Sequence, residues 1–235
     1  MRLSTTTNAD MSYTKTLSFK FEVLFGSMRK YGIIETFSNI IIRLYYRVLN
    51  IDFFTTESLF NQALIGEHKE CGTAYVPINK IVLNKILNEL YKIDTHIKKG
   101  YFIDFGSGKG FALSIAAKFG FKKVIGVEFA NELYLQGVKN IKKLQLNNIQ
   151  QYNQDASEYK IDKKTTVVYL FNPFNEIVMQ KVSKNIISLK DKFENNLYII
   201  YINPSCEYVF DKNFELIYQN RLEKEDFRVN IYKLV

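Results

Sequence analysis

The chain has 235 residues, of which 47% are hydrophobic and 24% are charged. This composition supplies enough apolar side chains for a packed core and excludes a largely disordered chain. The formal net charge of +8 is shared equally between residues 1–100 and 101–235, and no basic tail or stripe of the kind that binds nucleic acid stands out.

Cysteine content and hydropathy favour a soluble protein of the cytoplasm. Cys71 and Cys206 are the only cysteines, too few for the disulfide framework of a small secreted protein and without the spacing of metal ligands. No run approaches the roughly 18 apolar residues of a membrane span, and the N-terminus lacks the apolar centre of a signal peptide. We therefore expect reduced thiols and no metal site.

Residues 1–70 are expected to form a helical extension or lid. Between residues 33 and 49, apolar residues recur at steps of three and four, which predicts an amphipathic helix. Such a helix can pack on the following domain or cover its pocket, but a basic amphipathic helix with aromatic residues can also lie on a membrane surface or form an oligomer contact. A second amphipathic helix is predicted over residues 78–92.

From residue 101 onward, strand-like runs alternate with helical patterns, as in a parallel sheet covered by helices. The predicted strands are 101–105, 122–129, 148–156, 165–172, 196–203, 214–222 and 227–235, and the predicted helices are 109–120, 131–144 and 175–190. The resulting order is β-α-β-α-β-β-α-β-β-β, in which the helix after the third strand is missing or very short.

A glycine-rich turn, DFGSGKG, covers residues 104–110 after the first of these strands. Its G-x-G-x-G pattern differs from the G-x-G-x-x-G of dinucleotide-binding proteins and from a Walker loop. Small residues at a helix N-terminus still let a ligand approach free backbone N–H groups. A tight strand-to-helix turn without a ligand is the alternative explanation.

Acidic residues lie at the ends of the next two predicted strands. Glu128 comes 18 residues after Gly110, at the place where an acidic side chain accepts hydrogen bonds from both hydroxyls of an adenosyl ribose. Asp155 is expected to accept a hydrogen bond from the exocyclic amine of adenine. Because the carboxyl ends of parallel strands meet at one edge of a sheet, these turns are expected to bind one adenosine-containing ligand.

With these motifs the chain resembles the class I S-adenosylmethionine-dependent methyltransferases, whose first motif is an acidic residue followed by G-x-G-x-G. The similarity covers about residues 72–235. DFGSGKG, GFKKVIGVEFANEL and YLFNPF resemble a bacterial group of methyltransferase-domain proteins whose acceptor is unassigned and, more distantly, the Dot1-type lysine methyltransferases.

The resemblance implies an α/β fold with a Rossmann-like, mostly parallel sheet of seven strands, the last antiparallel, in a domain over residues 71–235. It also implies S-adenosylmethionine as the cofactor. The cofactor-binding residues would be Asp104, Gly106, Ser107, Gly108, Gly110, Glu128, Phe129, Asp155 and Ala156.

The acceptor side is expected at the end of the strand 165–172. Asn172, Pro173 and Phe174 match in part the (N/D)-P-P-(Y/F) motif of amino-methylating relatives, in which the first side chain and the prolyl carbonyl accept hydrogen bonds from an amine and the ring stacks on it. Only one proline is present here, and a simple turn that ends the strand is the alternative. Asn203, in INPSCE, is expected either to line the acceptor side or to form a turn.

Two further residues before the first strand are candidates for the site. Tyr75 lies in the predicted lid segment 70–79 and is expected to touch the methionine end of the cofactor or the acceptor, or else to pack against the sheet. A hydroxyl acceptor would need a base, for which His68 is the candidate, with an ordinary surface or capping role as the alternative.

The sequence therefore predicts a methyltransferase that acts on an amine or hydroxyl of a small-molecule or saccharide acceptor, with a protein lysine as the alternative acceptor. Nucleic acid ranks third, because no reading module is found. A methyltransferase-like fold that serves as a non-catalytic interaction or membrane-surface module is the second alternative. The oligomeric state is left open.

Overall fold

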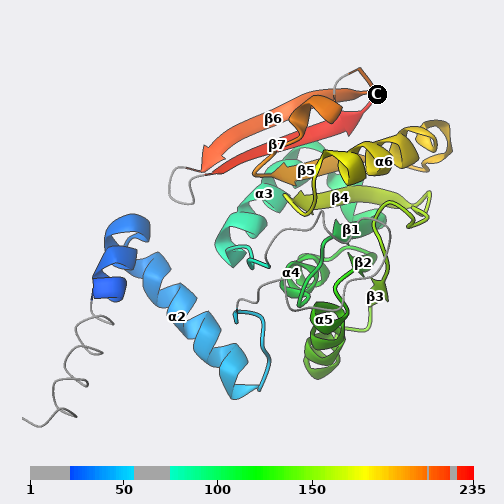
Figure 1. Ribbon diagram of the computed structural model, residues 1–235. Helices are drawn as coiled ribbons and strands as arrows, with labels where there is room; N and C mark the ends of the chain where they lie inside the picture. The colour runs from blue at the N-terminus through cyan, green and yellow to red at the C-terminus, as the bar shows by residue number, and fades with distance from the viewer. Residues whose placement is uncertain (1–21, 56–74, 211, 223–226) are drawn as a thin grey trace, which may run out of the picture. The chain divides into compact units, whose positions relative to one another are not determined.

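The computed structural model describes residues 22–55, 75–210, 212–222 and 227–235 (Figure 1). The chain divides into two compact units, Met1–Leu49 and Asn50–Val235. The boundary expected at residues 70–71 lies outside the described residues, as does His68. Residues 50–55 belong to the unit that carries the sheet.

In the first unit, the described residues form a helical stretch over residues 22–31, followed by helix α2 (Ile33–Val48), which the apolar repeat predicted. Gly32 separates them with a φ of +87°, a conformation that glycine adopts without steric cost. No helix of the described residues is long and apolar enough to cross a membrane. Within residues 33–49, the large apolar side chains that are exposed are Ile33, Ile34, Phe37, Ile40, Ile41, Leu44, Tyr45, Val48 and Leu49.

The second unit contains a seven-stranded sheet in the order β3-β2-β1-β4-β5-β7-β6 (Figure 1). The strands are β1 (Tyr101–Phe105), β2 (Lys123–Glu128), β3 (Ile149–Asn153), β4 (Thr165–Phe171), β5 (Tyr198–Ile202), β6 (Phe214–Leu222) and β7 (Phe227–Leu234). Strands β1 to β5 pair in parallel, whereas β7 is antiparallel to both β5 and β6. The predicted mostly parallel sheet with an antiparallel last strand is confirmed.

Helices cover this sheet. They are α3 (Lys80–Ile93), α4 (Phe111–Phe119), α5 (Asn131–Leu144) and α6 (Glu176–Ile187), with short 3-10 segments η3 (Thr95–Lys99), η4 (Lys190–Lys192) and η5 (Glu207–Val209). Helix α4 packs against β2 and α5 against β3, while α6 closes a buried cluster that includes Phe105 and Leu170 of β1 and β4. As expected, no helix separates β3 from β4.

The register of the strands brings their carboxyl ends to one edge. Phe105 pairs with both Val127 and Leu170, and Phe171 pairs with Ile202. The residues that follow β1, β2, β4 and β5 therefore leave the sheet at similar levels, which is where open α/β sheets bind ligands.

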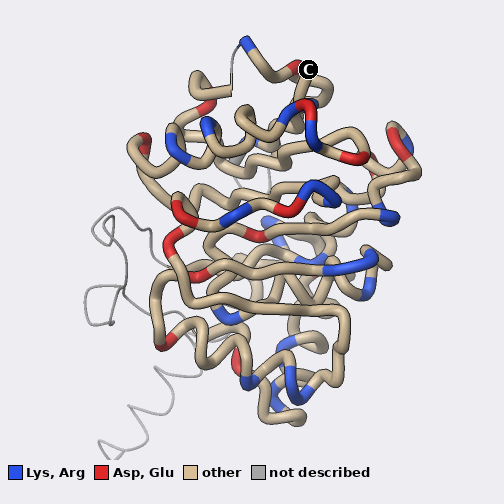
Figure 2. The backbone as a smooth tube through the Cα atoms, turned by 90° about the vertical axis from the view of Figure 1, so that its right-hand side faces the viewer, with Lys and Arg blue, Asp and Glu red and all other residues tan. Residues whose placement is uncertain are grey.

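Lysines concentrate at the opposite, amino edge of the sheet. The pairs 98–99, 122–123 and 163–164 stand at the start of β1, β2 and β4, and Lys190 and Lys192 precede β5. In Figure 2, blue segments accordingly recur at one end of the strands. The positive charge of this unit thus gathers away from the carboxyl edge.

Candidate functional site

The DFGSGKG turn connects β1 to α4 in a conformation that depends on glycine. Gly106, Gly108 and Gly110 have φ angles of +88°, +50° and +84°, a region that other residues rarely adopt. A Cβ atom on Gly108 would lie 2.3 Å from the ring of Tyr75, and one on Gly106 would lie 2.7 Å from Cβ of Pro173. The glycine turn therefore lies between Tyr75, in the predicted lid, and Pro173, in the predicted acceptor turn.

Glu128, at the end of β2, holds this turn in place through hydrogen bonds. Its Oε2 accepts a hydrogen bond of 2.8 Å from the backbone N–H of Gly108, and its Oε1 accepts one of 2.9 Å from Ala130. Burial raises the pKa of Glu128 to about 7 in spite of these bonds. Burial, and then the neighbouring Glu128, raise the pKa of Asp104 well above its ordinary value.

Buried polar groups beside the turn have no hydrogen-bond partner among the described residues. They include the hydroxyls of Ser107 and Tyr169, whose residues are 4% and 2% exposed. Tyr169 pairs with Asp104 across β4 and β1, and burial, with Asp104 and Tyr75, raises the pKa of its hydroxyl well above the ordinary value. Because an unpaired buried polar group costs about 1–3 kcal/mol, a polar ligand here would recover that cost.

A cleft of about 350 Å³, its open mouth included, lies at the carboxyl edge. It is lined by Gly106, Val127, Phe129, Gln154, Asp155, Ala156, Pro173, Phe174 and Val178. Six of these were predicted from the sequence. Val127 and Gln154 adjoin predicted residues, whereas Val178 comes from α6, and no sequence signal placed it there.

Asp155 is held in position by a local turn. Its Oδ1 accepts a hydrogen bond of 2.8 Å from the backbone N–H of Ser157, and the residue is 5% exposed. This Asx turn directs the residue toward the cleft that Phe129 and Ala156 also line.

The predicted acceptor turn follows β4. Asn172 has a φ of +39° and precedes a proline. A positive φ is uncommon for residues other than glycine, and a following proline disfavours it further. Such strain costs on the order of 1–3 kcal/mol and clusters at functional sites. Asn172 Oδ1 accepts a hydrogen bond of 2.6 Å from Oγ of Ser205, while Pro173 and Phe174 line the cleft.

Tyr75 lies over the glycine turn and not among the residues of the acceptor turn. Its ring covers Gly108, and its hydroxyl donates a hydrogen bond of 2.8 Å to the backbone oxygen of Phe53. Phe53 is fully buried and packs against Phe111, the first residue of α4, at 5.1 Å between ring centroids. The structure thus brings Tyr75 to the cofactor side of the predicted site.

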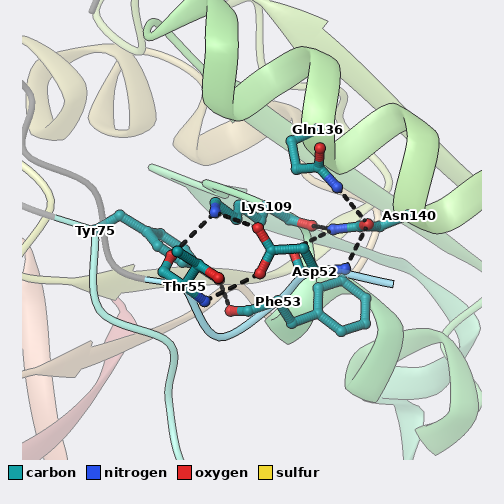
Figure 3. A network of polar contacts seen from close by, with 7 residues as sticks. All are labelled: Asp52, Phe53, Thr55, Tyr75, Lys109, Gln136 and Asn140. Carbon is teal, nitrogen blue, oxygen red and sulfur yellow. Dashed lines mark hydrogen bonds and ion pairs between the residues drawn. The ribbon is translucent and has the colours of Figure 1, made fainter. Parts of the chain in front are cut away.

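Segment 50–55 is attached to the same turn by a polar network that sequence reasoning missed (Figure 3). The fully buried side chain of Lys109 places Nζ 2.7 Å from Oδ2 of Asp52 and 3.0 Å from the backbone oxygen of Thr55. The Asn140 side chain accepts from the Asp52 N–H and donates to the backbone oxygens of Asp52 and Lys109. Because 57 residues separate Asp52 from Lys109 in the chain, no local pattern indicates this pair.

Histidines and metal ligands do not gather at this edge within the described part of the chain. His96 lies in η3 before β1, with Nδ1 3.4 Å from Oδ1 of Asp94. Residues 22–55, 75–210, 212–222 and 227–235 contain no group of three His, Cys, Asp or Glu side chains arranged to hold a metal ion.

No protein-family model and no curated protein matches the chain. Among solved structures, it is similar to an RNA methyltransferase from Salinibacter ruber in complex with S-adenosyl-L-homocysteine, with 22% identity, a TM-score of 0.51 and coverage of 68% of this chain and 94% of that one. It is also similar to a SAM-dependent methyltransferase from Aquifex aeolicus, with 12% identity, a TM-score of 0.52 and coverage of 68% and 100%. The second unit therefore has the fold of the S-adenosylmethionine-dependent methyltransferases.

Proposed function

We propose that the protein is an S-adenosylmethionine-dependent methyltransferase that acts on an amine or hydroxyl of a small-molecule or saccharide acceptor. One observation carries this proposal: predicted cofactor and acceptor residues line a single cleft. These residues are Gly106, Phe129, Asp155, Ala156, Pro173 and Phe174.

The residues at the cleft fit the parts of this cofactor. Phe129, Ala156 and Phe174 offer apolar surface to adenine, and Asp155 offers a carboxylate to its exocyclic amine. Glu128 already accepts two backbone hydrogen bonds, but each carboxylate oxygen has a second lone pair for a ribose hydroxyl.

The unpaired hydroxyls of Ser107 and Tyr169, with the buried carboxyl of Asp104, suit the charged methionine end. When bound, S-adenosylmethionine supplies a methyl carbon to which the acceptor atom forms a bond while the carbon–sulfur bond breaks; the electron pair stays on sulfur, and the acceptor proton passes to water.

Within this proposal, an amine is the favoured acceptor. Asn172 Oδ1 and the carbonyl of Pro173 can accept hydrogen bonds from N–H groups and so aim the nitrogen lone pair, and such alignment contributes much of the rate in a displacement. Phe174 adds an aromatic surface beside the cleft. A hydroxyl would need a base; of the two histidines, His68 lies outside the described residues, and His96 lies at the other edge of the sheet. The same geometry supports a protein lysine as the alternative acceptor.

Charge distribution argues against nucleic acid as the acceptor, although two of the similar solved structures are described as RNA methyltransferases, one of them provisionally. Phosphate contacts need cations beside the site. The described lysine pairs stand at the amino edge, whereas Asp104, Glu128 and Asp155 stand at the carboxyl edge.

A peripheral membrane contact through residues 33–49 is a separate proposal. It is supported by the exposed apolar side chains of α2 and by Arg43 and Arg47 on the same helix. Interfacial helices combine these two features.

Calorimetry tests the proposed function directly. Purified protein is expected to bind S-adenosylhomocysteine, and Gly106→Arg to abolish the binding, since the new side chain would fill the cleft. Gly26→Arg is the control, because nothing lies within 4 Å of a Cβ atom there. A folded wild-type protein that binds neither S-adenosylmethionine nor this product would contradict the proposal. Mass spectrometry of cell extract incubated with methyl-labelled cofactor then identifies the acceptor.

A further inference from the structure

Two Asn-Pro turns stand side by side at the carboxyl edge. Residues 172–174 read NPF after β4, and residues 203–205 read NPS after β5. These strands are neighbours, and Phe171 pairs with Ile202. Asn172 and Asn203 therefore leave the sheet at the same level.

Both turns hold the backbone in the same unfavourable conformation. Asn172 and Asn203 have φ angles of +39° and +50°, and each precedes a proline, which restricts the preceding residue to extended conformations. A turn that only ends a strand does not require a positive φ at an asparagine, because a glycine or a residue in an extended conformation could end the strand equally well. Strain repeated at two adjacent strand ends indicates a constraint of function.

A side-chain hydrogen bond joins the two turns. Oγ of Ser205 donates to Oδ1 of Asn172 over 2.6 Å, which fixes the orientation of the amide; an amide oxygen can accept two hydrogen bonds. Tyr201 contacts Ser205, since its hydroxyl lies 3.4 Å from Oγ of Ser205. The same hydroxyl accepts a hydrogen bond from the N–H of Cys206.

The turn 172–174 adjoins the residues that are expected to bind the cofactor. The turn 203–205 lies one strand further away. Pro173 lines the cleft and faces Gly106, whereas Asn203 and Ser205 are exposed beyond it. The polar side chains of the two turns are two amides and a hydroxyl. The carboxylate of Glu207, which follows, accepts hydrogen bonds from Arg228 and Asn230 at 2.8 and 3.1 Å.

Resting on the proposed methyltransferase function, we propose that the turn 203–205 completes the acceptor site and that Ser205 is a positioning residue for Asn172. The site takes an uncharged amine with at least one N–H, which Asn172 Oδ1 accepts. Ser205 acts by holding that oxygen in place and does not contact the methyl group.

The test compares Ser205→Ala, Ser205→Thr and a control, Ser188→Ala, in the full-length protein. Ser188 is exposed, and its Oγ donates to the backbone oxygen of Asn185, away from the site. Each variant is incubated with methyl-labelled S-adenosylmethionine and dilutions of cell extract, and its affinity for S-adenosylhomocysteine is measured by calorimetry.

We expect Ser205→Ala to lower kcat by about tenfold, the worth of one well-placed hydrogen bond, with little change in the apparent KM or in cofactor affinity. Ser205→Thr retains the hydroxyl and should recover most of the activity, and the control should match the wild type. Wild-type transfer by Ser205→Ala, or a parallel loss of cofactor binding, would overturn the role of Ser205 alone. Absence of labelled product from the wild type would overturn the proposed function as well.

Discussion

Glu128 shows how one buried side chain links the cofactor turn to pH. Backbone hydrogen bonds from Ala130, Gly108 and Phe129 favour its ionised form, but burial outweighs them and raises its pKa to about 7. The folded protein therefore binds more protons than the unfolded chain between about pH 4.5 and 7, and the raised pKa of Asp104 acts in the same direction.

We predict that Glu128 contributes most to the free energy of unfolding below about pH 4.5. As pH rises through 7 this contribution is lost, and the free energy of unfolding falls by at most about 3 kcal/mol. Glu128→Gln should reduce the decline in stability over this range. Urea denaturation across the range measures both slopes, with Glu215→Gln on β6 as an exposed control. Equal slopes in wild type and Glu128→Gln would contradict the assignment.

The same protonation is expected to influence ligand binding. Ribose hydroxyls donate to the ionised carboxylate, so affinity for S-adenosylhomocysteine should rise with pH up to about 7 and then level off. Calorimetry at several pH values can be run on the same samples.

At the scale of elements, segment 50–55 is the part of the chain that holds the glycine turn against α5. Asp52 pairs with Lys109, and Asn140 of α5 binds the backbone of both residues (Figure 3). A buried ion pair contributes less to net stability than to a specific arrangement, but removal of one partner leaves a buried charge.

We predict that Asp52→Ala destabilises the protein by about 2–3 kcal/mol, below the value for fully buried pairs, because the Asp52 side chain is 38% exposed. Adding Lys109→Met to this variant should restore part of the loss, since no buried ammonium then remains. Denaturation of the wild type, both single variants and the double variant gives the coupling energy. Additive effects would show that the pair does not act as a unit.

At the scale of the whole molecule, the two compact units suggest separable roles. The sheet unit begins at Asn50 and includes the partners of Lys109, whereas α2 belongs to the first unit. Removal of residues 1–49 therefore leaves every described residue of the cleft in place.

A protein lacking residues 1–49 is expected to bind S-adenosylhomocysteine with wild-type affinity but to lose sedimentation with anionic vesicles. Neutral vesicles and an Ile34→Glu, Ile41→Glu variant, altered at two exposed positions of α2, are the controls. Equal sedimentation of the shortened and full-length proteins would remove α2 as the membrane contact.

The sequence predicted the elements well where local signals are strong. The helix expected over residues 131–144 has the same bounds as α5, and the strand expected over 214–222 the same as β6. The places of Phe129, Asp155 and Pro173 on one cleft also followed from strand ends, because parallel strands bring their carboxyl ends together. Sequence reasoning did not indicate Tyr169, Val178, Ser205 or the Asp52–Lys109 pair, whose roles depend on segments far apart in the chain.

By itself, the sequence determined the alternation of strands and helices, the glycine turn and the acidic residues at or just after the ends of β1, β2 and β3, because hydrophobic periodicity and turn chemistry are local properties. Only the tertiary structure decided which polar groups are paired and which are left buried without a partner. Burial and pairing depend on neighbours that packing supplies, and for Lys109 and Asn172 those neighbours, Asp52 and Ser205, lie tens of residues away.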